Sequence, residues 1–298
     1  MSVVSPGAGA PNLSSGAISG RRRFSNHLAT AFIALSVILA VIPLALVCYY
    51  VLAKGASVVS WEFLSSDVPR SPRREGGGIW PAIVGTLLIT GAAALMAIPL
   101  GVLGAVYLNE YGKNRPLARV IRTMADVMTG VPSIVMGLFI YVAWVTQVGS
   151  QSGFAGALAL GCLMLPIVIR TTEEILRLVP DDLRQASAAL GARRWRTTVT
   201  VVLPAAVSGI TSGAMLAVAR AAGETAPLLA TIGLVYTANY SLMEGNTALP
   251  MLIFRNAAQP FDPAQQRAWG AALALVVIVV AFTIIARVIS SRFAIKDY

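Results

Sequence analysis

The sequence has few charged residues, only two cysteines and a single histidine. Charged side chains make up 12% of its 298 residues, whereas soluble domains average about 25%. Cys48 and Cys162 lie in separate apolar runs, so neither a disulfide framework nor a thiolate metal cluster is expected. His27 stands at the edge of another apolar run and is not expected to act as a ligand or base. These shortages argue against large soluble domains and against a metal centre.

Apolar residues are abundant instead, at 56% of the chain, and the mean hydropathy is +0.73. A helix needs about 20 mostly apolar residues to cross a bilayer. Six runs satisfy or approach this length, at residues 27–52, 79–108, 124–148, 154–169, 205–235 and 269–289. We therefore predict an all-α polytopic membrane protein with six transmembrane helices over residues 24–298. Residues 1–23, of which the first twenty are rich in Ser, Gly, Pro and Ala, are predicted to be a disordered cytoplasmic tail.

The basic residues are distributed unevenly between the two predicted faces of the membrane. Sixteen lie on the side of the two termini and six on the opposite side, while Arg220 alone falls inside a span. Because cytoplasmic loops carry an excess of Lys and Arg, both termini and the loop 170–204 are predicted to be cytoplasmic. The net charge of +10 is therefore attributed to topology, and no nucleic-acid partner is expected.

The loop 170–204 carries local signals for two short helices around a sharp corner. Asp181 and Asp182 suit the start of a helix, where carboxylates meet unpaired amides, and Gly191 suits the left-handed residue that closes one. Apolar side chains form a ridge before and just after the corner, at Leu183, Ala186, Ala189, Leu190 and Trp195. Such a ridge fits a groove on another protein or an anionic lipid surface, and its pattern alone leaves both alternatives open.

The predicted span 205–235 contains an arginine and a glutamate four residues apart. Arg220 and Glu224 would share one helix face and contact each other. Charged residues inside a membrane usually pair or mark a transport path, and a guanidinium binds oxyanions through two parallel hydrogen bonds. We predict that Arg220 meets an anionic substrate, that Glu224 holds it when the path is empty, and that Thr225 offers a hydroxyl nearby. A structural ion pair is the alternative.

Two further features are interpreted from local spacing. Pro132, close to Gly130, is expected to kink the third span. Asp126 follows Arg122 by four residues, so an ion pair between them is expected at the start of that span.

The loop resembles the signature loop of ABC importer permeases, which reads Glu-Ala-Ala, three residues, Gly, nine residues, Ile, any residue, Leu-Pro. The matching positions here are Gln185, Ala186, Ser187, Gly191, Val201, Leu203 and Pro204. Gln185, Ser187 and Val201 depart from the usual residues. The resemblance implies that the loop docks into an ATPase subunit and transmits its motion.

Three other motifs resemble the PstA-type permeases of phosphate-specific importers. They are G-G-I-W-P-A-I-V-G-T at 77–86, G-V-P-S-I-V at 130–135, and G-E-T-A-P-L at 223–228 with Arg220 before it. The resemblance implies a type I ABC importer permease in the bacterial cytoplasmic (inner) membrane that imports inorganic phosphate. It also implies a PstC-like second permease, a PstB-like ATPase dimer and a PstS-like binding protein outside.

ATP hydrolysis by this chain is not expected. A phosphate-binding loop needs Gly-Lys followed by Ser or Thr, and the only lysine after a glycine, Lys113, precedes Asn114. ATP-Mg is therefore expected on the partner ATPase, and no cofactor on this chain. An ion-coupled carrier with Glu224 as its proton site is a rival, whereas an intramembrane hydrolase is disfavoured because the spans lack a Ser-His or paired-Asp arrangement.

Overall fold

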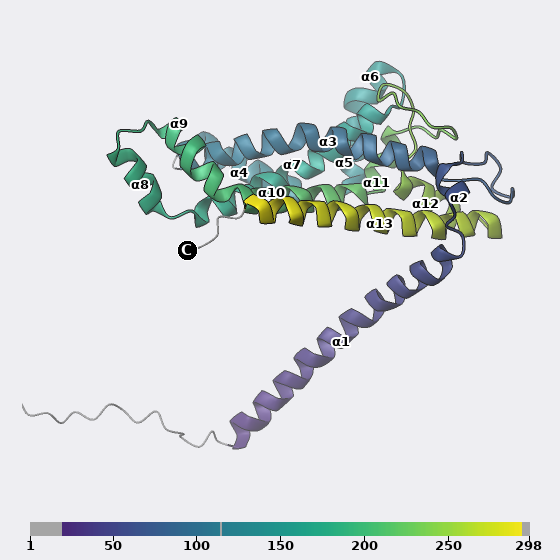
Figure 1. The fold of residues 1–298 in the computed structure, drawn as a ribbon, viewed down its shortest axis with the longest axis horizontal. Helices are drawn as coiled ribbons and strands as arrows, with labels where there is room; N and C mark the ends of the chain where they lie inside the picture. The colour runs from purple at the N-terminus through teal and green to yellow at the C-terminus, as the bar shows by residue number, and fades with distance from the viewer. Residues whose placement is uncertain (1–19, 114, 294–298) are drawn as a thin grey trace, which may run out of the picture. The chain divides into compact units, whose positions relative to one another are not determined.

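The structure, a computed structural model, describes residues 20–113 and 115–293. The described residues form helices joined by links and loops and contain no strand, so the predicted all-α class is confirmed. The chain divides into two units, Met1–Tyr50 and Val51–Tyr298, which are drawn together in Figure 1.

Helix α1 (Gly20–Ala56) supplies the described part of the first unit. Its segment Phe24–Ala56 is long and apolar enough to cross a membrane, and it is apolar around its whole circumference, as a lipid-facing helix is. Residues 1–19 of the predicted tail lie outside the described residues, whereas Gly20–Arg23, also assigned to the tail, form the first turn of α1.

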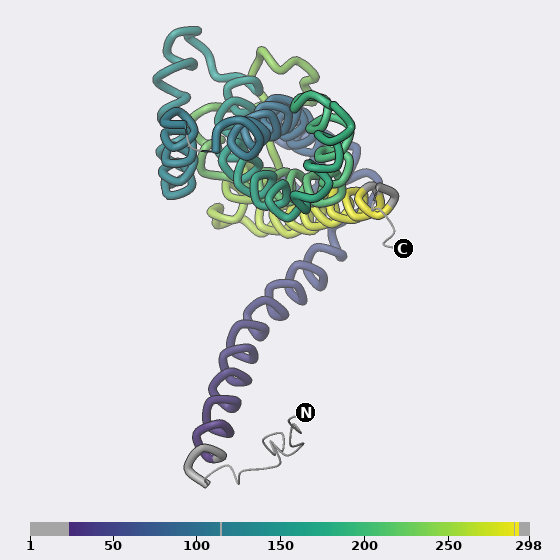
Figure 2. The backbone as a smooth tube through the Cα atoms, turned by 90° about the vertical axis from the view of Figure 1, so that its left-hand side faces the viewer, coloured from purple at the N-terminus to yellow at the C-terminus, as the bar shows by residue number. Residues whose placement is uncertain are grey.

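Four long helices make the body of the second unit. They are α3 (Trp80–Val106), α7 (Gly153–Leu178), α10 (Leu203–Ala222) and α13 (Asp262–Phe293). Helix α7 packs on α3 and α10, and α13 packs on α10 and on the short α12 (Leu249–Ala257). Figure 2 shows the bundle nearly end-on. The central core is built from small residues of α3, such as Ala93 and Ala97, against Leu160, Met164 and Val168 of α7.

The third predicted span is broken. Helix α4 (Pro116–Gly130) is followed by α5 (Ser133–Ile140), which continues through η2 (Tyr141–Val145) into α6 (Thr146–Val148). The two arms are bent by 108°. The expected kink at Pro132 is confirmed, because proline has no N–H to continue the helix, and the first arm begins at Pro116, before the predicted start of the span at residue 124. The described residues thus hold five membrane-length helices, or six when the bent pair counts as one.

Two other spans differ from their predicted limits. Helix α7 extends to Leu178, well beyond the predicted end at residue 169. The fifth span begins earlier and ends earlier than predicted, since α9 (Arg194–Thr197), η3 (Thr198–Val202) and α10 run on as one apolar helix that stops at Ala222. The second helix of the loop is therefore the start of this long helix and not a separate short one. Helix α11 (Ala226–Thr231) follows after a three-residue link.

The bundle has two distinct ends, which lie at opposite sides of Figure 1. One is formed by α2 (Trp61–Ser65), α12 and their loops, and the other by α8 (Asp181–Ala189) and α9. At the first end a Cβ on Gly85 of α3 would lie 2.0 Å from the carbonyl oxygen of Thr247. Only glycine allows the loop before α12 to approach α3 this closely. Near the second end, α3 continues as η1 (Tyr107–Tyr111).

Candidate functional site

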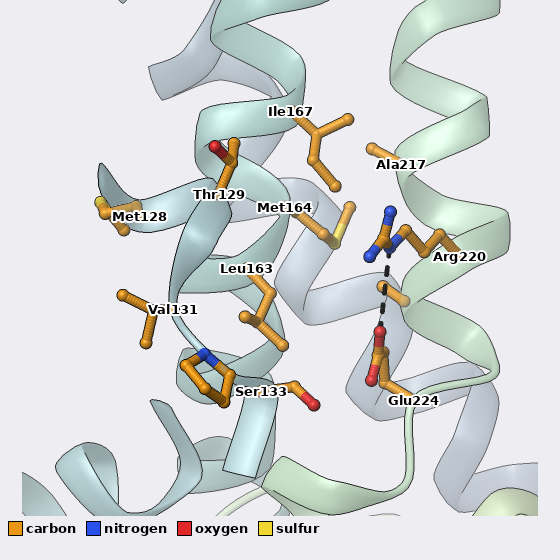
Figure 3. A pocket seen from close by; sticks show the side chains of 12 residues that line it. Met128, Thr129, Val131, Ser133, Leu163, Met164, Ile167, Ala217, Arg220 and Glu224 are labelled. Atoms are coloured by element: carbon orange, nitrogen blue, oxygen red, sulfur yellow. Dashed lines mark ion pairs between the residues drawn. The ribbon is translucent and has the colours of Figure 1, made fainter. Parts of the chain in front are cut away.

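A cavity of about 300 Å³ lies where the two broken spans meet α7. Figure 3 shows the side chains that surround it. The lining residues come from the end of α4, the start of α5, the middle of α7, the end of α10 and the links that follow α4 and α10: Met128, Thr129, Val131, Pro132, Ser133, Leu163, Met164, Ile167, Ala217, Arg220, Ala221 and Glu224. Arg220 and Glu224 are the charged residues among them, so the cavity combines an apolar wall with one cation and one anion.

Arg220 and Glu224 lie on the same side of this cavity, with their charged groups directed toward each other (Figure 3). Arg220 Nε lies 3.8 Å from Glu224 Oε1, and the side chains are 70% and 24% exposed. The predicted contact is therefore confirmed. This distance exceeds that of a charge-assisted hydrogen bond, about 2.8 Å. The guanidinium is thus neutralised by its partner while its N–H groups stay available to a ligand.

The pair does not lie on one helix face, as the sequence had suggested. Helix α10 ends at Ala222, so Glu224 belongs to the link before α11. The amides of Gly223 and Glu224 donate to the carbonyls of Arg220 and Ala221, which closes the helix with tight turns. The chain therefore breaks completely between α10 and α11, and Pro227 stands in the first turn of α11, where its missing N–H is tolerated.

Thr225 is not brought into the cavity in this conformation. It precedes α11, where its carbonyl accepts a hydrogen bond from the amide of Leu228, and it is not among the lining residues. The lining residues that carry a hydroxyl are Thr129, whose Oγ1 donates to the carbonyl of Asp126, and Ser133, on either side of the α4–α5 bend. Sequence reasoning missed both, although their position next to Gly130 and Pro132 was the available signal.

A series of ion pairs joins α4 to α7 on the side of the cavity that leads toward α8. Asp126 pairs with Arg170, and Arg122 Nε donates to Glu173 Oε1 at 2.8 Å. Arg177 reaches the same Glu173 oxygen at 2.6 Å. The expected pair between Arg122 and Asp126 is thus wrong, because each of these residues is matched by an opposite charge on α7.

The loop residues predicted to bind a partner lie on or beside α8. Leu183, Leu190 and Trp195 are 44%, 90% and 59% exposed, and Ala186 and Gln185 are exposed as well. Large apolar side chains at this exposure on a polar helix are typical of an interaction site. The predicted apolar ridge is therefore present on the surface of the described chain.

The corner after α8 has the predicted geometry. Gly191 has φ of +78°, a left-handed conformation that only glycine adopts without strain. Ser187 Oγ lies 2.9 Å from Thr197 Oγ1, which ties α8 to α9 across the corner. Leu203 and Pro204, the last residues of the signature, lie apart from this surface at the start of α10, where Leu203 packs into the core between α3 and α7.

Known protein families match this architecture. Residues 97–295 match the family described as binding-protein-dependent transport system inner membrane component. Relatives named phosphate transport system permease protein PstA 1 from Mycobacterium tuberculosis and PstA from Mycobacterium leprae are 44% and 46% identical over 90% and 88% of this chain and 90% and 87% of their own. The chain belongs to this family of permeases. A PstA from Haemophilus influenzae is 37% identical over 89% of the chain and 94% of its own length.

The PstA-type resemblance inferred from motifs is thereby confirmed, and the chain is a multi-span inner membrane component of an ABC transporter. Its relatives are transport subunits and not enzymes. The fold is confirmed by solved structures. An inward-facing MetNI methionine ABC transporter has a TM-score of 0.59 at 20% identity, over 73% of this chain and 95% of its own. A bacterial alginate importer has a TM-score of 0.57 at 13% identity, over 92% and 100%.

Proposed function

We propose that this permease carries inorganic phosphate in an ATP-driven importer and forms half of the pathway beside a PstC-like second permease. The names of relatives above 40% identity support the choice of substrate. The observation that carries the proposal is the Arg220 guanidinium, 70% exposed at the cavity and loosely paired with Glu224. A guanidinium presents two parallel N–H groups that match the oxygens of a tetrahedral oxyanion.

The loose pair suits a site that must fill and empty. A lone charge near the middle of a membrane helix costs about 2.5 to 3.5 kcal/mol, so Glu224 stabilises Arg220 in the empty state. An arriving anion takes over this neutralising role and moves the carboxylate aside. Thr225 would have to move with the 223–225 link to contribute its hydroxyl, whereas Thr129 and Ser133 are already among the lining residues.

The second part of the proposal concerns the energy source. We assign the exposed surface of α8, with Gln185, Ala186, Leu190 and Gly191 of the signature and Trp195 beyond it, to docking on a PstB-like ATPase dimer. Apolar anchors on an exposed helix favour a groove, and Trp and Arg are common hot-spot residues. ATP-Mg would be held by that ATPase and not by this chain.

The orientation follows from the charge distribution. The α8 end carries most basic residues and is assigned to the cytoplasm together with both termini. The opposite end, with α2, α12 and their loops, would then receive a PstS-like binding protein outside the membrane.

The test is phosphate uptake by the reconstituted complex. Vesicles that contain both permeases and the ATPase should take up labelled phosphate only with ATP and the binding protein, and an uncoupler should have no effect. Uptake by this chain alone that collapses with an uncoupler would instead support an ion-coupled carrier.

A further inference from the structure

Helix α8 is held to the bundle by few side chains. Seven of its nine residues are exposed, and only Arg184 and Ser187 are partly buried. Ser187 ties α8 to α9 through Thr197. Arg184 is therefore the side chain of α8 that can hold this helix against α3 and α7.

Arg184 joins α8 to the extension of α3. Its Nη2 donates to Glu110 Oε1 at 2.9 Å, and its Nε lies 3.3 and 3.4 Å from the two carboxylate oxygens. The side chains are only 16% and 12% exposed. Glu110 lies on η1, directly after α3, and its Oε1 also accepts from the side-chain amide of Asn109. Arg184 thus contacts the Glu110 carboxylate through both Nε and Nη2, and a lysine, which has a single ammonium nitrogen, could not reproduce this arrangement.

The same guanidinium also closes the end of α7. Arg184 Nη2 donates to the carbonyl of Leu176 at 2.9 Å, and Nη1 donates to the carbonyl of Val179 at 2.6 Å. Nη1 reaches Asp181 Oδ1 at 3.1 Å as well. The last carbonyls of a helix lack partners within it, and a cation there interacts favourably with the helix dipole. One side chain of α8 thus binds both α3 and α7.

Helix α7 leads from this contact to the cavity. Leu176 and Val179 are buried in one cluster with Ala105 and Val106 of α3, so the two helices move as a packed pair at this end. About two and a half to three and a half turns from Leu176, α7 supplies Leu163, Met164 and Ile167 to the cavity lining. Close packing transmits a displacement because interiors have few voids.

We propose that Arg184 is a positioning residue that transmits the movement of α8 to α3 and α7, and through α7 to the cavity. This inference rests on the proposed docking of the ATPase on α8. Glu110 is its matching residue on the bundle, and the pair acts as one unit. Loss of either partner leaves the ATPase bound but disconnects its motion from the transport path.

The experiment measures phosphate taken up per ATP hydrolysed by the full complex in vesicles. The Arg184→Ala and Glu110→Gln complexes should retain the ATPase and lose at least fivefold in this ratio. The double variant should be no worse than Arg184→Ala alone, since both remove the same link. Arg184→Lys should fall between, and Arg119→Ala, an exposed arginine of α4, should match the unaltered complex.

A purely structural role would lower uptake and hydrolysis together and leave their ratio unchanged, which would overturn the proposal. Loss of the ATPase from both single variants would overturn it as well, because Arg184 and Glu110 would then serve docking. Glu110→Gln keeps the inference testable if Arg184→Ala fails to fold. The docking proposal has a separate test: if the ATPase still co-purifies with a permease that carries Leu190→Asp, the docking proposal is wrong, whatever the Arg184 variants do.

Discussion

Gly137 of α5 faces Pro227 of α11 at backbone contact: a Cβ on Gly137 would lie 2.6 Å from Pro227 Cα and 2.8 Å from its carbonyl oxygen. Each residue belongs to the second arm of a broken span. The two breaks are therefore packed against each other, and this places the α4–α5 bend beside the end of α10 with the cavity between them.

Gly137→Ala should destabilise the permease by about 1 to 3 kcal/mol, the usual range for an overpacked contact. The clash involves backbone atoms, which cannot rotate away. Thermal unfolding of the purified complex measures the effect as a lower Tm. Gly91→Ala is the matched control, because no atom lies within 4 Å of its would-be Cβ, and its Tm should be unchanged or slightly higher. Equal Tm values for the two variants would contradict the packing described here.

Arg220→Ala should reduce phosphate uptake at least tenfold while the complex still assembles. A hydrogen bond to a charged group contributes about 1.5 to 3 kcal/mol, and the substitution removes two such donors from the cavity. Arg220→Lys should recover only part of the activity, since an ammonium lacks the two parallel N–H groups of a guanidinium. Arg287→Ala, an exposed arginine of α13, serves as the control. Normal uptake by Arg220→Ala would reduce the residue to a packing role.

Leu190→Asp should prevent co-purification of the ATPase. The leucine is 90% exposed at the corner of the loop, and a carboxylate would have to be desolvated in an apolar groove. Leu178→Asp is the control, a leucine that is 76% exposed but precedes the signature. If the ATPase is recovered equally with both variants, the assigned docking surface is incorrect.

Glu173→Ala should lower the stability of the permease by about 1.5 to 3 kcal/mol, the usual contribution of a hydrogen bond to a charged group, because the two arginines left behind are partly exposed and stay hydrated. Glu173 is only 2% exposed and binds both Arg122 and Arg177. Its neighbour Glu174 is exposed, so Glu174→Ala should leave the Tm within experimental error. A similar Tm for the two variants would indicate that the Glu173 pairs contribute little.

Cysteine labelling from outside tests the orientation. In a chain with Cys48 and Cys162 replaced by serine, Ser71→Cys should react with a membrane-impermeant maleimide in intact cells. Leu178→Cys, next to α8 but outside the assigned docking surface, should react only after the membrane is opened. Both positions are exposed in the structure. The reverse pattern would place α8 outside the cell and contradict the assignment of the loop to the cytoplasm.

Much of the architecture was predictable because its signals are local. Gly191 is left-handed, as its place after α8 predicts, and Pro132 interrupts a span, as a residue without an N–H must. The size of the bend, 108°, was not predictable from sequence, because it depends on how α5 packs on α11.

The partners in the ion pairs of α4 could not be predicted from local sequence spacing. Arg122 and Asp126 are neighbours on α4, yet each binds a residue of α7 that lies more than forty positions away. A pair at i and i+4 is worth only about 0.2 to 0.5 kcal/mol, so stronger and partly buried partners replace it. Thr129 and Ser133 were missed for the same reason, since a hydroxyl becomes part of a site only when the chain folds around it.

The breaks at Val131–Pro132 and Gly223–Thr225 have a consequence for the state of the membrane interior. Irregular backbone at membrane depth is tolerated only where protein covers it or where it lines a water-filled space, and both Pro132 and Gly223 are exposed. These breaks must therefore be covered by a neighbouring subunit or line water, and a hydrated space beside Arg220 would let an incoming anion exchange its shell of water for the guanidinium.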